Sequence, residues 1–165
     1  MLISGGGEAV TFHIRVRAGG IIVEDESILL IEFNDENGLH YNLPGGGVEE
    51  GVTVKAAAAR EVMEEASVQV DVGELVFVYE YEPEINTNKY GETSSLTLWF
   101  ECTLKENSRP EMPLKPDFSQ TGVKWIKLSE LNTITLFPDV KEQIVQYAIR
   151  RTSIPLLEEH SLKVN

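Results

Sequence analysis

Glu61, Glu64 and Glu65 are separated by three and four positions, the spacing that brings side chains to one face of an α-helix. Carboxylates this close repel one another and destabilise a helix unless a cation lies among them. Magnesium prefers carboxylate and water oxygens, and it keeps coordination positions that substrate phosphates can take. The three acids therefore indicate a magnesium site for phosphoryl chemistry, while a merely solvated helix face is the alternative that they leave open by themselves.

A run of three glycines, Gly45 to Gly47, precedes these acids. Glycine lets the backbone approach a ligand closely and turn where other residues cannot. A plain turn would also explain the glycines, but their place just before a helix with three acids favours a ligand-binding loop.

Together, residues 46–68 resemble the Nudix box, whose pattern is Gly, five residues, Glu, seven residues, then Arg-Glu-aliphatic-any-Glu-Glu-any-Gly-aliphatic. The matching positions are Gly46, Arg60, Glu61, Val62, Glu64, Glu65 and Val68. The chain departs from the pattern at Val52, where the family has its first Glu, and at Ser67, where it has the closing Gly. We expect Val52 to leave Arg60 less constrained, and Ser67 to adopt the backbone conformation of a glycine at a small cost in strain.

The resemblance implies a hydrolase that cleaves a diphosphate linkage, either in a nucleoside diphosphate joined to another moiety or in a nucleoside triphosphate. The implied cofactor is Mg²⁺, with Mn²⁺ as a substitute. The implied metal ligands are Glu61, Glu64, Glu65 and the carbonyl of Gly45, and Arg60 would orient the carboxylates. A catalytically impaired Nudix module that binds nucleotides or regulates a partner is the alternative.

The general base is open between two places. Within the box it would be Glu64 or Glu65, and in a later loop it would be Glu111 or Asp117, since members of the family differ in this respect. Glu111 and Asp117 could equally be solvated loop residues.

Substrate-binding candidates lie on the strands outside the box. Arg15 and Arg17 could bind phosphate or pair with surface acids. Tyr81, with Tyr79 and Trp99, could stack on a base or belong to the core. Specificity is expected to depend on residues 34–42, 82–94 and 105–121.

The elements that would position these residues follow from hydropathy patterns. Residues 11–17 predict a strand that buries Phe12, Ile14 and Val16, and residues 21–23 and 28–33 predict a hairpin. Residues 34–47 and 105–121 read as loops. The remaining expected elements are a helix at 54–66, strands at 68–81, 95–104 and 122–128, and a helix at 139–151. This order predicts an α+β (α/β) fold, namely a Nudix-type α/β/α sandwich with a central mixed sheet, spanning residues 11–152 between a lead-in at 1–10 and a tail at 153–165.

The composition of the chain limits the kinds of binding partner that we expect. The net charge of −13 disfavours a nucleic acid polymer, because binding one requires neutralising its phosphates with Lys and Arg. No apolar stretch is long enough for a bilayer, no secretory leader opens the chain, and Cys102 is the single cysteine. We therefore expect a cytoplasmic protein that acts on a small nucleotide-like substrate, without membrane attachment. Homodimers are frequent in the family.

Overall fold

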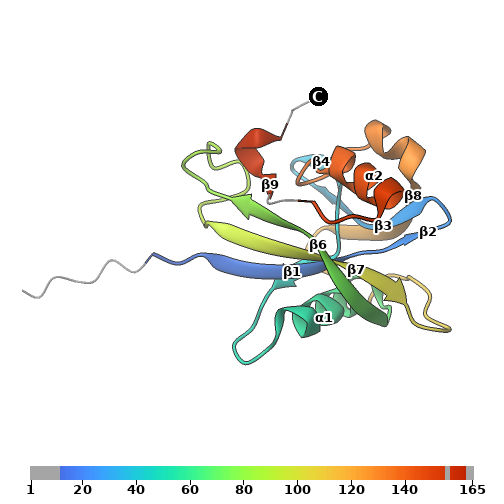
Figure 1. Cartoon of the computed structure of the whole chain (residues 1–165). Helices are drawn as coiled ribbons and strands as arrows, with labels where there is room; N and C mark the ends of the chain where they lie inside the picture. Colours follow the sequence, from blue (N-terminus) through green and yellow to red (C-terminus); the bar gives the residue numbers. More distant parts are fainter. Residues whose placement is uncertain (1–11, 155–156, 163–165) are drawn as a thin grey trace, which may run out of the picture.

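The computed structural model describes residues 12–154 and 157–162, in which two β-sheets and two main α-helices form layers (Figure 1). The first sheet has the order β5-β1-β7-β6-β9. Strands β1 and β7 are parallel, as are β6 and β9, whereas the β1–β5 and β6–β7 pairs are antiparallel. This sheet is therefore mixed, as predicted. Its strands are β1 (Arg15–Ile21), β5 (Gly45–Gly47), β6 (Val70–Tyr81), β7 (Ser95–Leu104) and β9 (Leu157–Glu158).

The second sheet is built around one long strand, β3. It pairs antiparallel with β2 and β4, and also with β8. The turn between β2 and β3 has positive φ at Asp25 (45°) and Glu26 (59°), which is the backbone shape that a tight hairpin requires. The predicted hairpin is thus confirmed. The strands are β2 (Val23–Glu24), β3 (Ser27–Asp35), β4 (Gly38–Asn42) and β8 (Gln120–Lys127).

Helix α1 (Val54–Ala66) has the predicted bounds, because its sequence is rich in alanine and glutamate, which favour a helix. The Thr53 hydroxyl accepts a hydrogen bond from the Ala56 amide at 3.3 Å and caps the first turn. At the other end Ser67 has φ 57° and ψ 27°, the left-handed conformation usually taken by glycine, and its amide donates to the Met63 carbonyl at 3.0 Å. The expected glycine-like conformation of Ser67 is confirmed.

The second helix, α2 (Lys141–Arg150), lies on the opposite side of the first sheet from α1 (Figure 1). Two 3₁₀-helices, η1 (Leu128–Thr133) and η2 (Glu159–Ser161), complete the fold. Ile144 and Tyr147 form the buried stripe of α2. The α/β/α arrangement is therefore confirmed.

Two apolar clusters hold the layers together. One contains Ala57, Ala58 and Val62 of α1 with Phe100 and Cys102 of β7. Burial raises the pKa of the Cys102 thiol to about 12, as expected for a cysteine that serves as a small core residue. The other cluster lies on the α2 side and includes Leu30, Phe77, Trp99, Leu136 and Ile144.

The expectation for the first strand is wrong. Phe12 is 70% exposed and Ile14 46% exposed, and β1 runs from Arg15 to Ile21, straight through Gly19 and Gly20. A Cβ at Gly19 would collide with Trp99 and the Pro44 carbonyl, so the glycines are needed where β1 lies tightly between β5 and β7. The alternation of apolar and polar residues before Arg15 therefore does not indicate a buried face.

Smaller differences concern loops and ends. Residues 34–47, expected as a loop, contain β4 and β5, and the expected strands at 68–81 and 122–128 begin at Val70 and Gln120. Beyond residue 152, β9 pairs with β6, so described residues of the expected tail join the first sheet. The division of the chain at residues 10 and 152 stays a prediction, and the lead-in at 1–10 lies outside the described residues.

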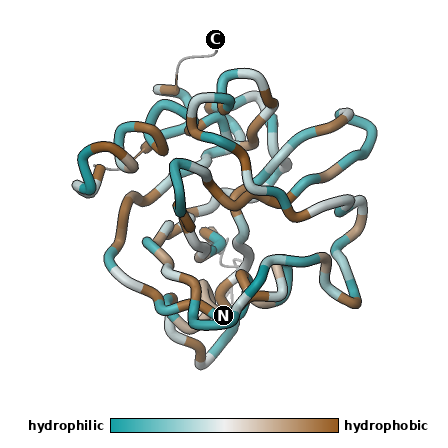
Figure 2. The backbone as a smooth tube through the Cα atoms, turned by 90° about the vertical axis from the view of Figure 1, so that its right-hand side faces the viewer, coloured by the Kyte–Doolittle hydropathy of each residue, from teal (hydrophilic) through white to brown (hydrophobic). Residues whose placement is uncertain are grey.

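No helix of the described residues is long and apolar enough to cross a membrane. Figure 2 shows why at the level of single residues: hydrophobic stretches along the backbone are short and are interrupted by hydrophilic ones.

Candidate active site

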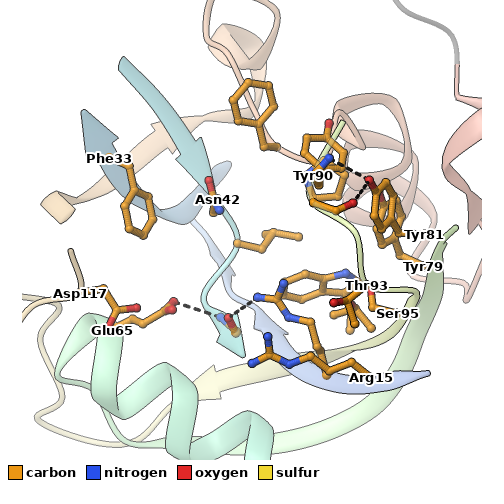
Figure 3. A pocket seen from close by; sticks show the side chains of 18 of the residues that line it. Arg15, Phe33, Asn42, Glu65, Tyr79, Tyr81, Tyr90, Thr93, Ser95 and Asp117 are labelled. Atoms are coloured by element: carbon orange, nitrogen blue, oxygen red, sulfur yellow. Dashed lines mark hydrogen bonds between the residues drawn. The ribbon is translucent and has the colours of Figure 1, made fainter. Parts of the chain in front are cut away.

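A pocket of about 430 Å³ lies beside the C-terminal end of α1 (Figure 3). Acidic residues gather at one side of it and tyrosines at the other. Residues from both sheets, from α1 and from four loops line it: Arg15, Arg17, Phe33, Asn42, Leu43, Gly45, Glu65, Tyr79, Tyr81, Tyr90, Gly91, Glu92, Thr93, Ser95, Thr97, Trp99, Asp117, Phe137 and Pro138.

Glu65 provides the buried acid of the pocket. It lies in the last turn of α1, is 8% exposed, and accepts a hydrogen bond from the Gly45 amide at 3.1 Å. Burial raises the pKa of its carboxyl to about 8, and the nearby charges of Asp117 and Glu61 act in the same direction. The Gly45 hydrogen bond and Arg17 oppose this rise without cancelling it. The carboxyl therefore exchanges a proton near neutral pH.

Glu61 is the second buried acid, and the glycine loop makes room for it. A Cβ at Gly46 would collide with its carboxylate, so the loop touches the helix here only because residue 46 has no side chain. Arg60 forms an ion pair with Glu61, with 2.8 Å between Nη2 and Oε1. Burial nevertheless raises the pKa of Glu61.

The Glu64 side chain is directed toward Arg60, unlike the buried side chains of Glu61 and Glu65. Both Glu64 carboxylate oxygens accept hydrogen bonds from Arg60 Nη1, at 3.2 and 3.1 Å, and its side chain is about half exposed. Arg60 also donates to the Gly47 carbonyl at 2.7 Å and lies 3.6 Å from Glu49. Arg60 therefore has partners on both the loop and the helix in the presence of Val52, and the expected effect of Val52 on Arg60 stays a prediction.

The predicted carboxylate cluster is correspondingly looser than expected. Among the described residues, no three acidic, histidine or cysteine side chains lie close enough together to enclose a metal ion. Arg60 is the cation nearest to Glu64 and draws it outward, while Glu61 and Glu65 stay buried on the loop side. These two acids still offer the oxygen ligands that hard divalent cations prefer, and a nearby cation would offset the cost of burying them. The donor set thus fits Mg²⁺ or Mn²⁺.

Arg15 and Arg17 both line the pocket. Arg17 donates to the Gly45 carbonyl at 3.3 Å, and its buried Nε has no hydrogen-bond partner among the described residues. Burial and the neighbouring Arg15 lower the pKa of Arg17, while Glu65 and Glu61 oppose the change. The ion pairs of the described residues include neither arginine, which leaves both available for an anion.

The two loop acids have different positions. Both acids are exposed, but Asp117 lies at the pocket beside Glu65, whereas Glu111 is absent from the pocket lining and meets α1 through its backbone amide, which donates to the Ala66 carbonyl at 3.1 Å. Gln120 anchors this loop to α1: its side-chain amide donates to the Glu65 carbonyl at 2.8 Å, and its side-chain oxygen accepts from the Asp117 amide at 3.3 Å. The structure therefore brings Asp117, and not Glu111, to the acids of the box.

Tyrosine and tryptophan side chains form the other part of the pocket wall. Tyr81, a predicted contact, lines it, but its hydroxyl donates to the Gly91 carbonyl at 2.8 Å and accepts from the Tyr90 amide at 2.9 Å. Tyr79 and Trp99 are also in the wall, and both are core residues as well. The core interpretation therefore holds for Tyr79, Tyr81 and Trp99, and stacking on a base stays a prediction.

Sequence reasoning missed Asn42 and Tyr90. Asn42 Oδ1, the Tyr90 hydroxyl and Trp99 Nε1 are buried without hydrogen-bond partners among the described residues, and all three residues line the pocket. Asn42 had a usable signal, since it is a polar residue at a strand end next to the glycine loop. Tyr90 lies in an irregular loop within residues 82–94, which were expected to affect specificity, but nothing in the sequence distinguished this residue from its neighbours.

Comparison with known proteins agrees with this architecture. Residues 13–148 match the model of the NUDIX domain. The chain therefore belongs to the Nudix family, and the resemblance drawn from the box is confirmed.

The individual relatives are 38% or less identical to the chain in sequence. The chain is 38% identical over 118 residues to a "MutT-like protein" of Streptomyces ambofaciens, which covers 71% of this chain and 66% of that protein. The chain thus spans slightly less than two thirds of the length of that relative. The fold is similar to a NUDIX hydrolase from Nitrosomonas europaea (TM-score 0.68, 21% identity, 90% of this chain and 81% of the other). It is also similar to an ADP-ribose pyrophosphatase from Streptococcus suis (TM-score 0.61, 18% identity, 88% and 99%).

Proposed function

We propose that this Nudix protein is a hydrolase dependent on Mg²⁺, with Mn²⁺ as a substitute, that cleaves a diphosphate linkage in a nucleotide-like substrate. The substrate would be a nucleoside diphosphate joined to another moiety, or a nucleoside triphosphate. One observation carries the proposal: the buried Glu65 carboxyl and the Arg17 guanidinium both bind the Gly45 backbone, at a pocket large enough for a nucleoside. This arrangement provides a place for a cation and a place for a phosphate side by side.

Glu61, Glu64, Glu65 and the Gly45 carbonyl would hold the cation. The two buried acids are in place, while Glu64 would have to exchange Arg60 for the cation. When bound, the cation neutralises charge on the diphosphate and acidifies the attacking water.

The chain's own residues have separate tasks in this proposal. Arg15 and Arg17 bind phosphate oxygens, and Arg60 holds the glycine loop against the helix. Asp117 or Glu65 accepts a proton from the attacking water, since these are the two acids that line the pocket near the loop. The tyrosine side of the pocket receives the nucleoside or the second moiety.

A binding module without catalysis is the second candidate. It is favoured by the pairing of Arg60 with Glu61 and Glu64, which gives two of the three box acids a cation already. A module of this kind would bind nucleotides in the same pocket but release no product.

A substrate panel separates the two candidates. The purified protein is incubated with Mg²⁺ or Mn²⁺ and with ADP-ribose, nucleotide sugars, dinucleoside polyphosphates or nucleoside triphosphates, and phosphate-bearing products are measured. We expect turnover of at least one compound, reduced at least about 100-fold by Glu65→Gln. Glu74→Gln is the matched control, because Glu74 is exposed on β6. Absence of product with both metals would contradict the hydrolase and leave the binding module.

A further inference from the structure

Glu159 is a buried acid far along the chain from the box, and beyond the residues that match the family model. It lies in η2 and is 7% exposed. Its Oε2 accepts a hydrogen bond from the Tyr79 hydroxyl at 2.9 Å, and its Oε1 pairs with Lys89 Nζ at 2.9 Å. A buried carboxylate destabilises a fold unless each oxygen has a partner, and here each oxygen has one.

Both partners of Glu159 belong to the wall of the substrate pocket or are joined directly to it. Tyr79 lines the pocket from β6. Lys89 immediately precedes Tyr90 and lies 5.0 Å from the centre of its ring. Burial and the adjacent Glu159 raise the pKa of the Tyr79 hydroxyl, so it stays a hydrogen-bond donor at physiological pH.

These contacts fix the position of Tyr90. Its backbone amide donates to the Tyr81 hydroxyl at 2.9 Å, which fixes the loop from the strand side. The Lys89–Glu159 pair fixes the same loop from the C-terminal side, where β9 and η2 lie beside it (Figure 1). Tyr90 belongs to the pocket wall across from Glu65 (Figure 3), but its hydroxyl is buried, so the side chain presents its ring to a ligand.

Strand β9 brings Glu159 to this position. It pairs in parallel with β6, with Tyr79 opposite Leu157 and Glu80 opposite Glu158. The next residue is Glu159, whose side chain turns inward to Tyr79. The C-terminal segment is therefore attached to the strand that carries two residues of the pocket wall.

We infer that Glu159 is a positioning residue for substrate binding: through Lys89 and Tyr79 it holds the loop of Tyr90, so that the ring of Tyr90 packs against the bound nucleotide. As far as it concerns substrate, this inference rests on the proposed function. Glu159 does not line the pocket and touches no reacting atom. Its loss should weaken substrate binding and leave the chemistry beside Glu65 unchanged.

The test compares Glu159→Gln with Glu158→Gln, which makes the same chemical change one residue earlier on a side chain outside both contacts. The two contacts use different oxygens of Glu159. Glutamine is neutral and replaces one of these oxygens with an NH2 group, which is a donor, so one contact loses its acceptor and the charge that pairs with Lys89 is lost. With the best compound of the panel, we expect Glu159→Gln to raise KM about tenfold, equivalent to about 1.4 kcal/mol, with kcat changed less than about twofold. Glu158→Gln should match the unmodified protein.

Two further variants locate the effect. Tyr90→Ala removes the ring, and it should raise KM by itself, while Glu159→Gln should add little in the Tyr90→Ala background, because both changes act on one contact. Lys89→Met and Tyr79→Phe remove one Glu159 partner each and should raise KM in the same direction. They also test the inference if Glu159→Gln folds poorly.

Several results would overturn the inference. One is an unchanged KM in Glu159→Gln together with a lower melting temperature, which would show a purely structural role. Another is a fall in kcat at constant KM. Calorimetry with AMP, GMP, CMP and UMP in the absence of metal gives a readout that does not require turnover. Weaker binding of a monophosphate by Glu159→Gln would support the inference even if the panel showed no hydrolysis, whereas equal affinity, or no binding by the unmodified protein, would contradict it.

Discussion

The Gly45 amide donates a hydrogen bond to Glu65 Oε2 across 3.1 Å, although the two residues are twenty positions apart in the chain. The bond joins the glycine loop to the last turn of α1. The neighbouring Gly45 carbonyl accepts from Arg17, so one residue contacts the acid and the arginine of the pocket through its two backbone groups. Glu65 still has a pKa near 8, because a single amide does not replace the water lost on burial.

Cation binding should therefore release a proton. At pH 7 and without metal most Glu65 carboxyls are protonated, and a metal ligand must be ionised. Calorimetric titration with Mn²⁺ in buffers of different ionisation enthalpy should show about one proton released per ion. In Glu65→Gln, proton release and affinity should both fall. Release of no proton by the unmodified protein would show that Glu65 is not a ligand.

The stability of the metal-free protein should decrease as the pH rises from about 4.5 to about 8. The Glu65 pKa is 4.5 unfolded and about 8 folded, so the folded protein holds more protons within this window. Its contribution is fully present below pH 4.5 and is lost as the pH rises through 8, at up to about 1.4 kcal/mol per pH unit. Urea unfolding at several pH values measures it. Glu65→Gln should have a flatter profile, and identical profiles would contradict this account.

Asp117→Asn should lower kcat at least about tenfold, because Asp117 lies at the pocket beside Glu65 and general-base catalysis contributes at least this much. Glu111→Gln should leave kcat unchanged, since Glu111 is an exposed residue outside the pocket lining and serves as a control from the same loop. Steady-state rates of both variants are measured with the compound of the substrate panel that the unmodified protein cleaves fastest. Full activity of Asp117→Asn would assign the base to the box acids.

Ser67→Gly should stabilise the protein by about 1 kcal/mol, because Ser67 has a φ of 57°, which is unfavourable for a residue with a Cβ. Denaturant unfolding gives the free energy, and activity should not change. Ser129→Gly is the control: Ser129 lies in η1 without positive φ, so glycine there should destabilise by about 0.5 to 1 kcal/mol. The same sign for both variants would contradict the argument.

The extent to which sequence predicted structure depends on how local the information was. Helix α1 was predicted to the residue, since the alanines and the acids that favour a helix lie within it. The first strand was misplaced, because an alternating pattern cannot reveal that Phe12 is left largely exposed by the described elements.

The candidate site divides in the same way. Box spacing predicted the residues of the helix and the loop, and pocket residues also come from each segment expected to affect specificity, namely Asn42, Tyr90 and Asp117. The outward turn of Glu64 toward Arg60 and the contact of Glu159 with Tyr79 depend on distances between side chains, which no spacing encodes.

Val52→Glu tests the departure of the box from its family pattern. Restoring the family's Glu would raise turnover if Arg60 lacked a partner, but Arg60 already contacts the Gly47 carbonyl, Glu61 and Glu49. Val52 itself is partly buried and packs against the apolar cluster that contains Ala57, Ala58 and Val62 of α1. We therefore expect Val52→Glu to change kcat less than about twofold and to destabilise the protein by about 1 kcal/mol, the central value for single substitutions. A tenfold gain in kcat would show that the contacts of Arg60 in the unmodified protein are insufficient to hold the loop in its active position, and that the loss of the family's Glu impairs the enzyme.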